Sequence, residues 1–425
     1  MRKIIFAGLL GLIVVAAIPY GTIEAWWKAA VVFAAFGLCI LAIIEGAISG
    51  STYVGPRSIL LPLVVLAAFA FVQTISFTQQ QTWQAISADP YQTRFFVLQI
   101  LALTICLALL YRYASNERYM RIMVHVVIAV GVASAIFGIL RQSTQQHDGF
   151  VIPLLRNQGY GQFLNKNHFA YLMEMAFGLG LGMILARGVR RDRLMMYAAL
   201  MFPIWIALVL SNSRGGIVAM LTQIIVAVLW MSSQRVVVKA ALVAVLVAGV
   251  LIGTLWVGGD KLATNIESAS TDFAGDTTRD GASRNEIWRA TLKMFAAHPL
   301  AGVGFGGYWI GITAYHDASG TLTPQEAHNE YLEVLSSGGL IGFAILVWFA
   351  VSVFRKVQEN LRSDRGFVRR SIRFSAVLGM IGVVVHSLLD FGLHLMGNAL
   401  IFFVLIMLAT ASVNEKVIDP GVQQQ

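Results

Sequence analysis

The chain has 425 residues, of which 57% carry hydrophobic side chains and only 12% are charged. A soluble globular protein has about 25% charged residues, and a disordered chain is polar and poor in aromatic residues, so both classes are excluded. The composition predicts a polytopic α-helical membrane protein, and in that class the net charge of +9 does not indicate a nucleic-acid partner.

Hydrophobic stretches long enough to cross about 30 Å of hydrocarbon occur twelve times along the sequence. They cover about 4–20, 29–46, 58–75, 95–111, 122–140, 168–187, 194–211, 215–231, 236–257, 337–355, 372–392 and 394–412. The first begins Met1-Arg2-Lys3, as a signal peptide would, but no small-x-small cleavage site precedes Pro19. We therefore expect a retained first helix.

The basic residues predict the orientation of these spans. With the N-terminus in the cytoplasm, the even-numbered connections fall inside, and they hold most of the 31 Lys and Arg. The positive-inside rule favours this arrangement. We expect three regions: nine spans in 1–257, a large periplasmic loop at 258–336, and three spans with a cytoplasmic tail in 337–425.

The outer loops, at about 141–167 and 258–336, are where we expect function. An insertion as long as the second usually has its own structure. That loop is rich in Asp and Glu, so its few cations are not generic surface charge. Cys39 and Cys106 fall inside predicted spans, and we interpret them as small core residues rather than as disulfide partners or metal ligands.

The first short helix of the large loop is predicted over Arg284–Ala297. Ser283-Arg284-Asn285-Glu286 has the form of a capping box, and His298-Pro299 ends the apolar pattern. Arg284 then lies in the first turn, where a cation is unfavourable unless an anion such as a phosphate also binds there. Arg289 and Lys293 share one face of this helix.

A glycine-rich segment follows, Ala301-Gly302-Val303-Gly304-Phe305-Gly306-Gly307-Tyr308. No strand precedes it and no Lys-Ser/Thr follows, so a nucleotide-binding loop is a weak interpretation. We expect these glycines to permit a tight backbone path.

The second short helix is predicted to begin at Thr323-Pro324-Gln325-Glu326, again a capping box, and to run into the tenth span. His328 would lie in its first turn, near backbone N–H dipoles that keep an imidazole neutral and able to act as a base. The alternative is an ordinary surface or capping histidine.

Several ionisable residues lie at the ends of spans or inside them. His386, Asp390 and His394 are four residues apart near the outer end of the eleventh span, and Glu174 lies within the sixth. Such groups usually face a cavity. They line a substrate site, or they pair with one another to hold two helices together, with Asp390 orienting a neighbouring His or Arg. The second role is slightly favoured for His386, Asp390 and His394.

The order of motifs resembles the O-antigen ligase and O-antigen polymerase superfamily of membrane glycosyltransferases of the GT-C type. The motifs that carry the resemblance are Ser211-Asn212-Ser213-Arg214-Gly215-Gly216, Arg284-Asn285-Glu286-Ile287-Trp288, His298-Pro299-Leu300-Ala301-Gly302, His328-Asn329-Glu330-Tyr331-Leu332 and Gly338-Gly339-Leu340-Ile341-Gly342. Two further segments also resemble the family, Phe163-Leu164-Asn165-Lys166-Asn167-His168 and His386-Ser387-Leu388-Leu389-Asp390-Phe391.

The resemblance implies a glycan donor linked to undecaprenyl pyrophosphate and a sugar hydroxyl as acceptor, joined in one inverting displacement without a metal or other cofactor. It implies that His328 is the general base and that Arg214 and Arg284 complete the catalytic group. Guanidinium groups suit that role because they match phosphate oxygens two at a time. Arg214 has a rival interpretation as an interfacial arginine. The candidate substrate-binding residues are Lys166, Arg289, Asn329, Tyr331, His386 and Asp390.

The leading functional hypothesis is an O-antigen ligase of the bacterial inner membrane, which transfers the glycan to the lipid A–core oligosaccharide on the periplasmic side. The alternatives are an O-antigen or exopolysaccharide polymerase, whose acceptor is a second lipid-linked repeat unit, and a protein O-oligosaccharyltransferase. A secondary transporter belongs to a different class, and it is disfavoured because no internal repeat is visible and the polar groups gather on one side.

Overall fold

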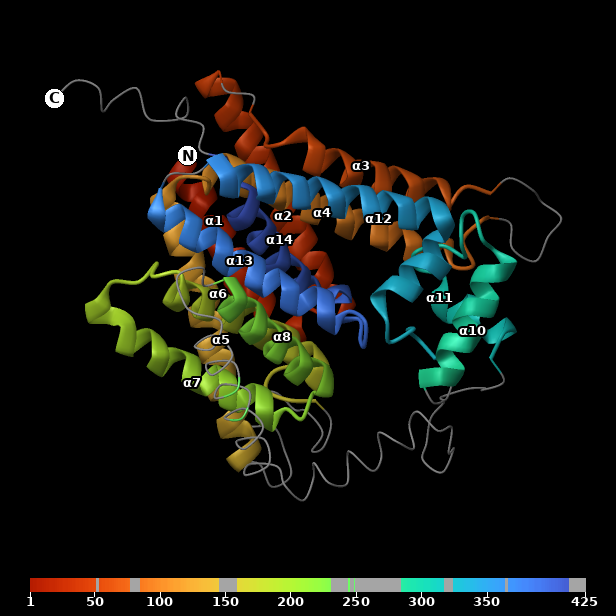
Figure 1. The fold of residues 1–425 in the computed structure, drawn as a ribbon. Helices are drawn as coiled ribbons and strands as arrows, with labels where there is room; N and C mark the ends of the chain where they lie inside the picture. The colour runs from red at the N-terminus through yellow and green to blue at the C-terminus, as the bar shows by residue number, and fades with distance from the viewer. Residues whose placement is uncertain are drawn as a thin grey trace.

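A computed structural model describes residues 1–50, 53–76, 85–144, 159–230, 284–316, 324–363 and 366–412, together with residues 244 and 248. Within these residues the chain is helical, and the longer helices form one bundle (Figure 1). In chain order the elements are α1 (Arg2–Ala17), η1 (Pro19–Gly21), α2 (Ala25–Ser49), α3 (Arg57–Val72), α4 (Pro90–Tyr113), α5 (Glu117–Thr144), α6 (Lys166–Leu185), η2 (Arg191–Arg193), α7 (Leu194–Leu210), α8 (Arg214–Trp230), α10 (Arg284–Ala297), α11 (Tyr308–Gly311), η3 (Ile312–Ala314), α12 (Glu330–Ser363), α13 (Phe367–His386), η5 (Gly392–His394) and α14 (Met396–Thr410).

The prediction of an all-α polytopic membrane protein is confirmed. Six helices in the described ranges are long and apolar enough to cross a membrane, and α3, α8 and α14 are shorter apolar helices. Eleven of the twelve predicted spans coincide with a helix, although α12 extends well beyond its predicted span at both ends. The ninth, 236–257, lies almost wholly outside the described residues, so the count of twelve stays a prediction.

Helix α6 forms the centre of the bundle and packs most extensively on α13. Glycines permit this close crossing: a Cβ at Gly178 would lie 2.6 Å from the backbone nitrogen of Gly379, and one at Gly182 would lie 2.4 Å from Cα of Ser375. Small residues at such contacts allow two helix backbones to approach each other. The crossing fixes the N-terminal end of α6 relative to the C-terminal end of α13.

One end of the bundle is basic. Arg2 and Arg112 both pair with the buried Glu45, at 2.9 and 2.7 Å, which joins the start of α1 to the ends of α2 and α4. At the same end Glu117, which begins α5, lies 3.5 Å from Arg369 near the start of α13. This is the end that the positive-inside rule places in the cytoplasm. The opposite end, which we call the outer end, is formed by the starts of α6, α8 and α12 and the end of α13.

Helices α10 and α11 lie apart from the bundle, beside the start of α12 (Figure 1). They have a small core of their own, formed by Ala290, Met294, Val303, Tyr308, Ile312 and Ala327. The segment after α10 is anchored at a break in α12, where Gly339 has φ 62°. The backbone N–H groups of Leu340 and Ile341, freed by the break, donate to the carbonyls of Pro299 and Leu300 at 2.8 and 3.1 Å.

The glycine-rich segment follows the tight path that we expected. Gly302 has φ +67°, and a Cβ there would lie 2.4 Å from the Ser337 carbonyl. Gly304 has φ +91°, and a Cβ there would lie 2.2 Å from the Ser87 hydroxyl. A larger residue would push the loop away from α12 at Gly302 and away from Ser87, before α4, at Gly304.

Candidate functional site

At the outer end of the bundle, charged side chains from distant parts of the sequence meet around one buried carboxylate. Asp390 Oδ2 lies 3.7 Å from Arg284 Nη2, and Asp390 Oδ1 lies 3.6 Å from His328 Nδ1. Asn167 Nδ2 donates to Asp390 Oδ2, and the Phe391 N–H donates to Asp390 Oδ1 at 2.9 Å. We call Asp390, Arg284, His328 and Asn167 the Asp390 cluster. Asp390 is 1% exposed, whereas the Arg284 and His328 side chains are about a third exposed.

The start of α8 is tied to this cluster through Asn167. Ser213 Oγ donates to Asn167 Oδ1 at 2.8 Å, and the Gly216 N–H donates to Ser213 Oγ at 3.2 Å. Arg214, the first residue of α8, therefore lies beside the cluster with its side chain exposed. The exposed Lys166 interacts electrostatically with Arg214, Arg284 and Asp390. The structure thus gathers three cations and one carboxylate at this position.

His328 lies outside helix α12, so the predicted helix start at Thr323 is wrong for the described residues 324–329. The helix begins at Glu330, because Asn329 caps it: Asn329 Oδ1 accepts the N–H groups of Tyr331 and Leu332 at 3.0 and 3.1 Å. His328 itself has φ 50°, a left-handed conformation that ends any helix running through it. The capping-box pattern misled the prediction, since Asn is an equally strong cap.

Asn329 and Tyr331 both hold the start of α12 against the end of α13. Asn329 Nδ2 donates to the Leu388 carbonyl at 2.9 Å, and the Tyr331 hydroxyl donates to the Val384 carbonyl at 2.9 Å. These contacts place His328 over Asp390. A direct role of either side chain in substrate binding stays a prediction.

Helix α10 has the bounds that the sequence predicted, and Arg284 lies in its first turn. The capping residue Ser283 lies outside the described residues. Arg289 lies on the exposed side of the helix, and no ion pair joins it to Asp390 within the described ranges. Of the two arginines, the structure therefore brings Arg284 to the Asp390 cluster.

His386, Asp390 and His394 do not pair with one another, so the predicted pairing among these three is wrong, whereas Asp390 does lie beside a neighbouring His and Arg, as expected. His386 Nδ1 lies 3.0 Å from Glu174 Oε2, and both side chains are buried between α13 and α6. This pair lies directly under the start of α8, because a Cβ on Gly215 would be 2.5 Å from His386 Nε2. His386 therefore supports Arg214 from below, while Asp390 and His394 have separate partners.

His394 contacts three carboxylates. Its Nδ1 is 3.3 Å from Glu326 Oε2, and its Nε2 is 3.4 Å from Glu330 Oε2 and 3.5 Å from Glu333 Oε1. We call these four residues the His394 cluster. Ligand-type atoms of Glu326, Glu333 and His394 lie within 4.8 Å of one another, as in a metal site. However, both ring nitrogens face carboxylates, and Glu330 and Glu333 already accept the N–H groups of Leu393 and Ala327 at 2.9 Å. We therefore interpret the group as an ion-pair cluster.

The two clusters shift the pKa of their loop carboxyl groups in the same direction. Burial alone would raise the pKa of Asp390, but nearby His328 and His168 and the hydrogen bond from the Phe391 N–H outweigh burial and hold it below its ordinary value. Burial likewise opposes ionisation of Glu326, but His394 lowers its pKa to about 2. Burial would lower the pKa of His394, but the nearby carboxyl groups of Glu333, Glu330 and Glu326 raise it above its ordinary value. Asp390, Glu326 and His394 are therefore ionised near neutral pH.

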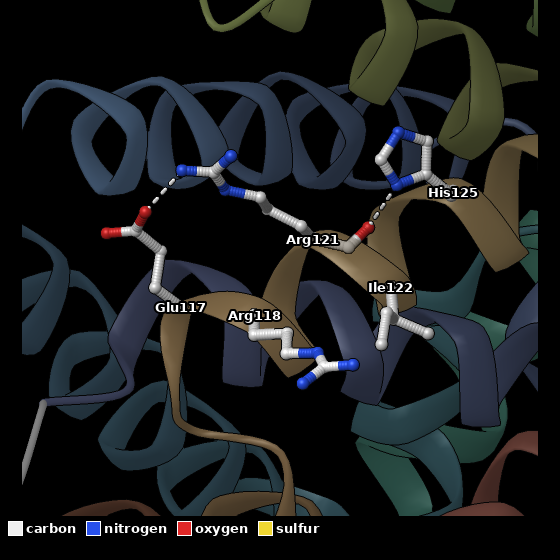
Figure 2. A pocket seen from close by; sticks show the side chains of 5 residues that line it. All are labelled: Glu117, Arg118, Arg121, Ile122 and His125. Carbon is white, nitrogen blue, oxygen red and sulfur yellow. Dashed lines mark hydrogen bonds and ion pairs between the residues drawn. The ribbon is translucent and has the colours of Figure 1, made fainter.

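A second basic position lies at the other end of the bundle. A pocket with a volume of about 500 Å³ lies at the start of α5. Its lining side chains are Glu117, Arg118, Arg121, Ile122 and His125 (Figure 2). Arg121 pairs with Glu117, and His125 Nδ1 lies 2.6 Å from the Arg121 carbonyl. Arg369, near the start of α13, pairs with Glu117 of this pocket, whereas His386 ends α13, so the pocket and the candidate site lie at opposite ends of that helix. The pocket is a useful comparison for the arginines of the outer end.

Comparison with known protein families gives one match. Residues 197–347 match the family described as O-antigen ligase. This segment belongs to the O-antigen ligase superfamily. The resemblance predicted from the motifs is confirmed, and the superfamily covers O-antigen ligases and related polymerases, which are glycosyltransferase-like enzymes. A comparison with curated proteins finds no match.

The O-antigen ligase segment contains Arg214, Arg284 and His328, but not Lys166 or Asp390. The sequence also failed to indicate the part played by Asn167 and Ser213. The only available signal was their position inside two family-like motifs.

Proposed function

We propose that the protein is an O-antigen ligase of the inner membrane, which transfers a glycan from undecaprenyl pyrophosphate to a sugar hydroxyl of the lipid A–core oligosaccharide. The observation that carries the proposal is the convergence of Arg284, His328 and Asp390 from three segments at the outer end of the bundle. The family match supports the reaction class, and the opposite, basic end supports a site that faces the periplasm.

The charges of the site suit a diphosphate. Arg214, Arg284 and Lys166 carry three positive charges against the single negative charge of Asp390. A guanidinium binds phosphate oxygens in pairs, and it stabilises the charge that develops as the diphosphate leaves. Arginine can thereby fill the role that a divalent cation has in metal-dependent transferases. Arg284 is already ordered by Asp390 and by the first turn of α10.

His328 is suited to remove the proton of the acceptor. Its Nδ1 faces Asp390, so Nε2 is the nitrogen left to take a proton, as in other histidine–carboxylate pairs. In the displacement, the acceptor oxygen bonds to the anomeric carbon and the bond from that carbon to the diphosphate oxygen breaks. The acceptor proton passes to His328, and the lipid diphosphate leaves. Asp390 stabilises the imidazolium that results.

The decisive experiment is a choice of acceptor. Purified protein in nanodiscs receives an undecaprenyl-pyrophosphate oligosaccharide with either rough lipopolysaccharide or a second lipid-linked repeat unit, in excess EDTA. We expect glycan on the lipopolysaccharide, at an undiminished rate in the chelator. Extension of only the lipid-linked unit would make the protein a polymerase, and a requirement for added Mg²⁺ or Mn²⁺ would contradict neutralisation by arginine.

A further inference from the structure

The His394 cluster joins the segment that carries the candidate base to the segment that carries Asp390. Glu326, Glu330 and Glu333 flank His328 in the sequence, and His394 follows Asp390 by four residues. All three carboxylates contact the one imidazole at 3.3 to 3.5 Å. The imidazole is therefore the common partner of three acidic side chains on one side of the site.

Backbone hydrogen bonds reinforce the junction. The Leu393 N–H donates to Glu330 Oε1 at 2.9 Å, and the Glu330 N–H donates to the Ser387 carbonyl at 3.0 Å. The Ala327 N–H, next to His328, donates to Glu333 Oε2 at 2.9 Å. Glu330 and Glu333 thus have two functions at once: they pair with His394, and they fix the backbone next to His394 at Leu393 and next to His328 at Ala327.

A positive charge on His394 is what makes this arrangement favourable. The Glu333 and Glu330 side chains are only 7% and 12% exposed, so water solvates negative charge on this group of carboxyl side chains poorly, and a cation at His394 offsets that cost. Other titratable groups also face the cluster: Lys28 of α2 interacts with Glu326 and His168 of α6 interacts with His394. The phenol groups of Tyr171, Tyr308 and Tyr331 also lie near its carboxylates. Among the residues that the structure describes, only the His394 imidazole contacts all three carboxylates, so none of these groups replaces it.

The imidazole of His394 is separated from the reacting position by an aromatic ring. The Phe391 ring centroid lies 4.9 Å from that of His328 and 5.6 Å from that of His394. His394 therefore acts on His328 through the backbone and not by contact. The left-handed backbone at His328, φ 50°, is a conformation that persists only where surrounding contacts enforce it.

We propose that His394 is a positioning residue: as a cation it holds Glu326, Glu330 and Glu333 together and so keeps His328 beside Asp390. The inference rests on the proposed function only for its effect on the rate of transfer. Its effect on the backbone is independent of any reaction. Loss of the charge should loosen residues 324–333 and leave the arginines that bind the donor in place.

The test compares His394→Gln, which is neutral, with His394→Lys, which keeps a positive charge. His125→Gln is the matched control, because it removes an imidazole from the opposite end of the bundle. Hydrogen exchange of the full-length protein in nanodiscs is the first measurement. We expect His394→Gln to raise the rate of hydrogen exchange in residues 324–335 and 387–395 by about 10-fold or more. His394→Lys and the His125→Gln control should exchange at close to the wild-type rate.

The second measurement is steady-state transfer. We expect His394→Gln to lower kcat by about 10- to 100-fold, the size of effect that a small displacement of a catalytic group produces, with the KM for the lipid-linked donor nearly unchanged. His394→Lys should restore most of kcat. If His394→Gln does not fold, Glu330→Gln serves instead, with a smaller increase of exchange in the same two segments.

Three results would overturn the proposal. The first is hydrogen exchange at the wild-type rate in His394→Gln, or in Glu330→Gln if that variant is used instead. The second is a His394→Lys variant as impaired as His394→Gln. The third is a stoichiometric divalent metal in the purified protein that is lost on mutation of His394. The last would mean that a metal, and not a proton, balances the carboxylates. If wild-type protein transfers no glycan, the proposed function fails, while the exchange measurement still decides the role of His394.

Discussion

Replacing Asp390 with Asn should slow transfer without removing the donor site. The substitution keeps the size of the side chain and removes its charge, which faces His328 Nδ1 at 3.6 Å and Arg284 Nη2 at 3.7 Å. At that separation an imidazolium and a carboxylate attract each other by about 4–5 kcal/mol if the effective dielectric constant is about 20. The His328 side chain is 33% exposed, so we keep about half of this value for solvent screening.

A loss of about 2 kcal/mol from the protonated state of His328 corresponds to a roughly 30-fold lower rate. The imidazole also loses the group that orients it, so the total reduction in kcat should lie at about 10²–10³, below the roughly 10⁴ found where a histidine loses a directly hydrogen-bonded carboxylate. The assay is transfer of a fluorescent lipid-linked oligosaccharide to lipopolysaccharide in nanodiscs.

The matched control is Asp192→Asn, which removes an exposed carboxylate that pairs with Arg190 at the basic end. We expect it to transfer glycan at the wild-type rate. An Asp390→Asn enzyme with kcat within twofold of wild type, and with normal protein level, would refute the reasoning that Asp390 orients and charges His328.

Further predictions concern binding, stability and pH. Arg284→Lys keeps the positive charge but loses the paired N–H groups of the guanidinium, so we expect the KM for the lipid-linked glycan to rise about 10-fold or more. The exposed Arg289→Ala should change this KM little. Equal effects of the two substitutions in steady-state kinetics would contradict the assignment. Glu174→Gln replaces the buried carboxyl group that lies 3.0 Å from His386, so we expect the free energy of unfolding to fall by about 1–3 kcal/mol, measured by thermal unfolding in detergent. Because the pKa of Asp390 is depressed, the difference in free energy of unfolding between wild type and Asp390→Asn should stay constant from pH 8 to pH 5. It should shrink only below the ordinary aspartate pKa of about 4. A difference that disappears by pH 6 would contradict this prediction.

The sequence was sufficient for the helices and for the ends of α10. Hydrophobic stretches of a fixed length mark membrane helices because the bilayer leaves few alternatives, and His298-Pro299 marks a helix end by local chemistry. The residue at which α12 begins could not be predicted from the sequence. Two capping signals compete there, Thr323 and Asn329, and tertiary contacts of Asn329 with the end of α13 decide between them.

The contacts of the candidate site were beyond the sequence alone. Asn167 and Asp390 are 223 residues apart, and nothing local indicates that one donates to the other. The close crossing of α6 and α13 at Gly178 and Gly379 brings them together. The residue types suited to phosphate and proton transfer were predictable, whereas their partners depend on helix packing.

The central claim is that the guanidinium groups of Arg214 and Arg284 hold the donor diphosphate beside His328. The most direct measurement is a cryo-EM structure of the protein in nanodiscs with undecaprenyl pyrophosphate. We predict density for the diphosphate between Arg214 and Arg284, with His328 on the side open to an acceptor. A diphosphate bound at the basic end of the bundle, near Arg118 and Arg121, would contradict the account.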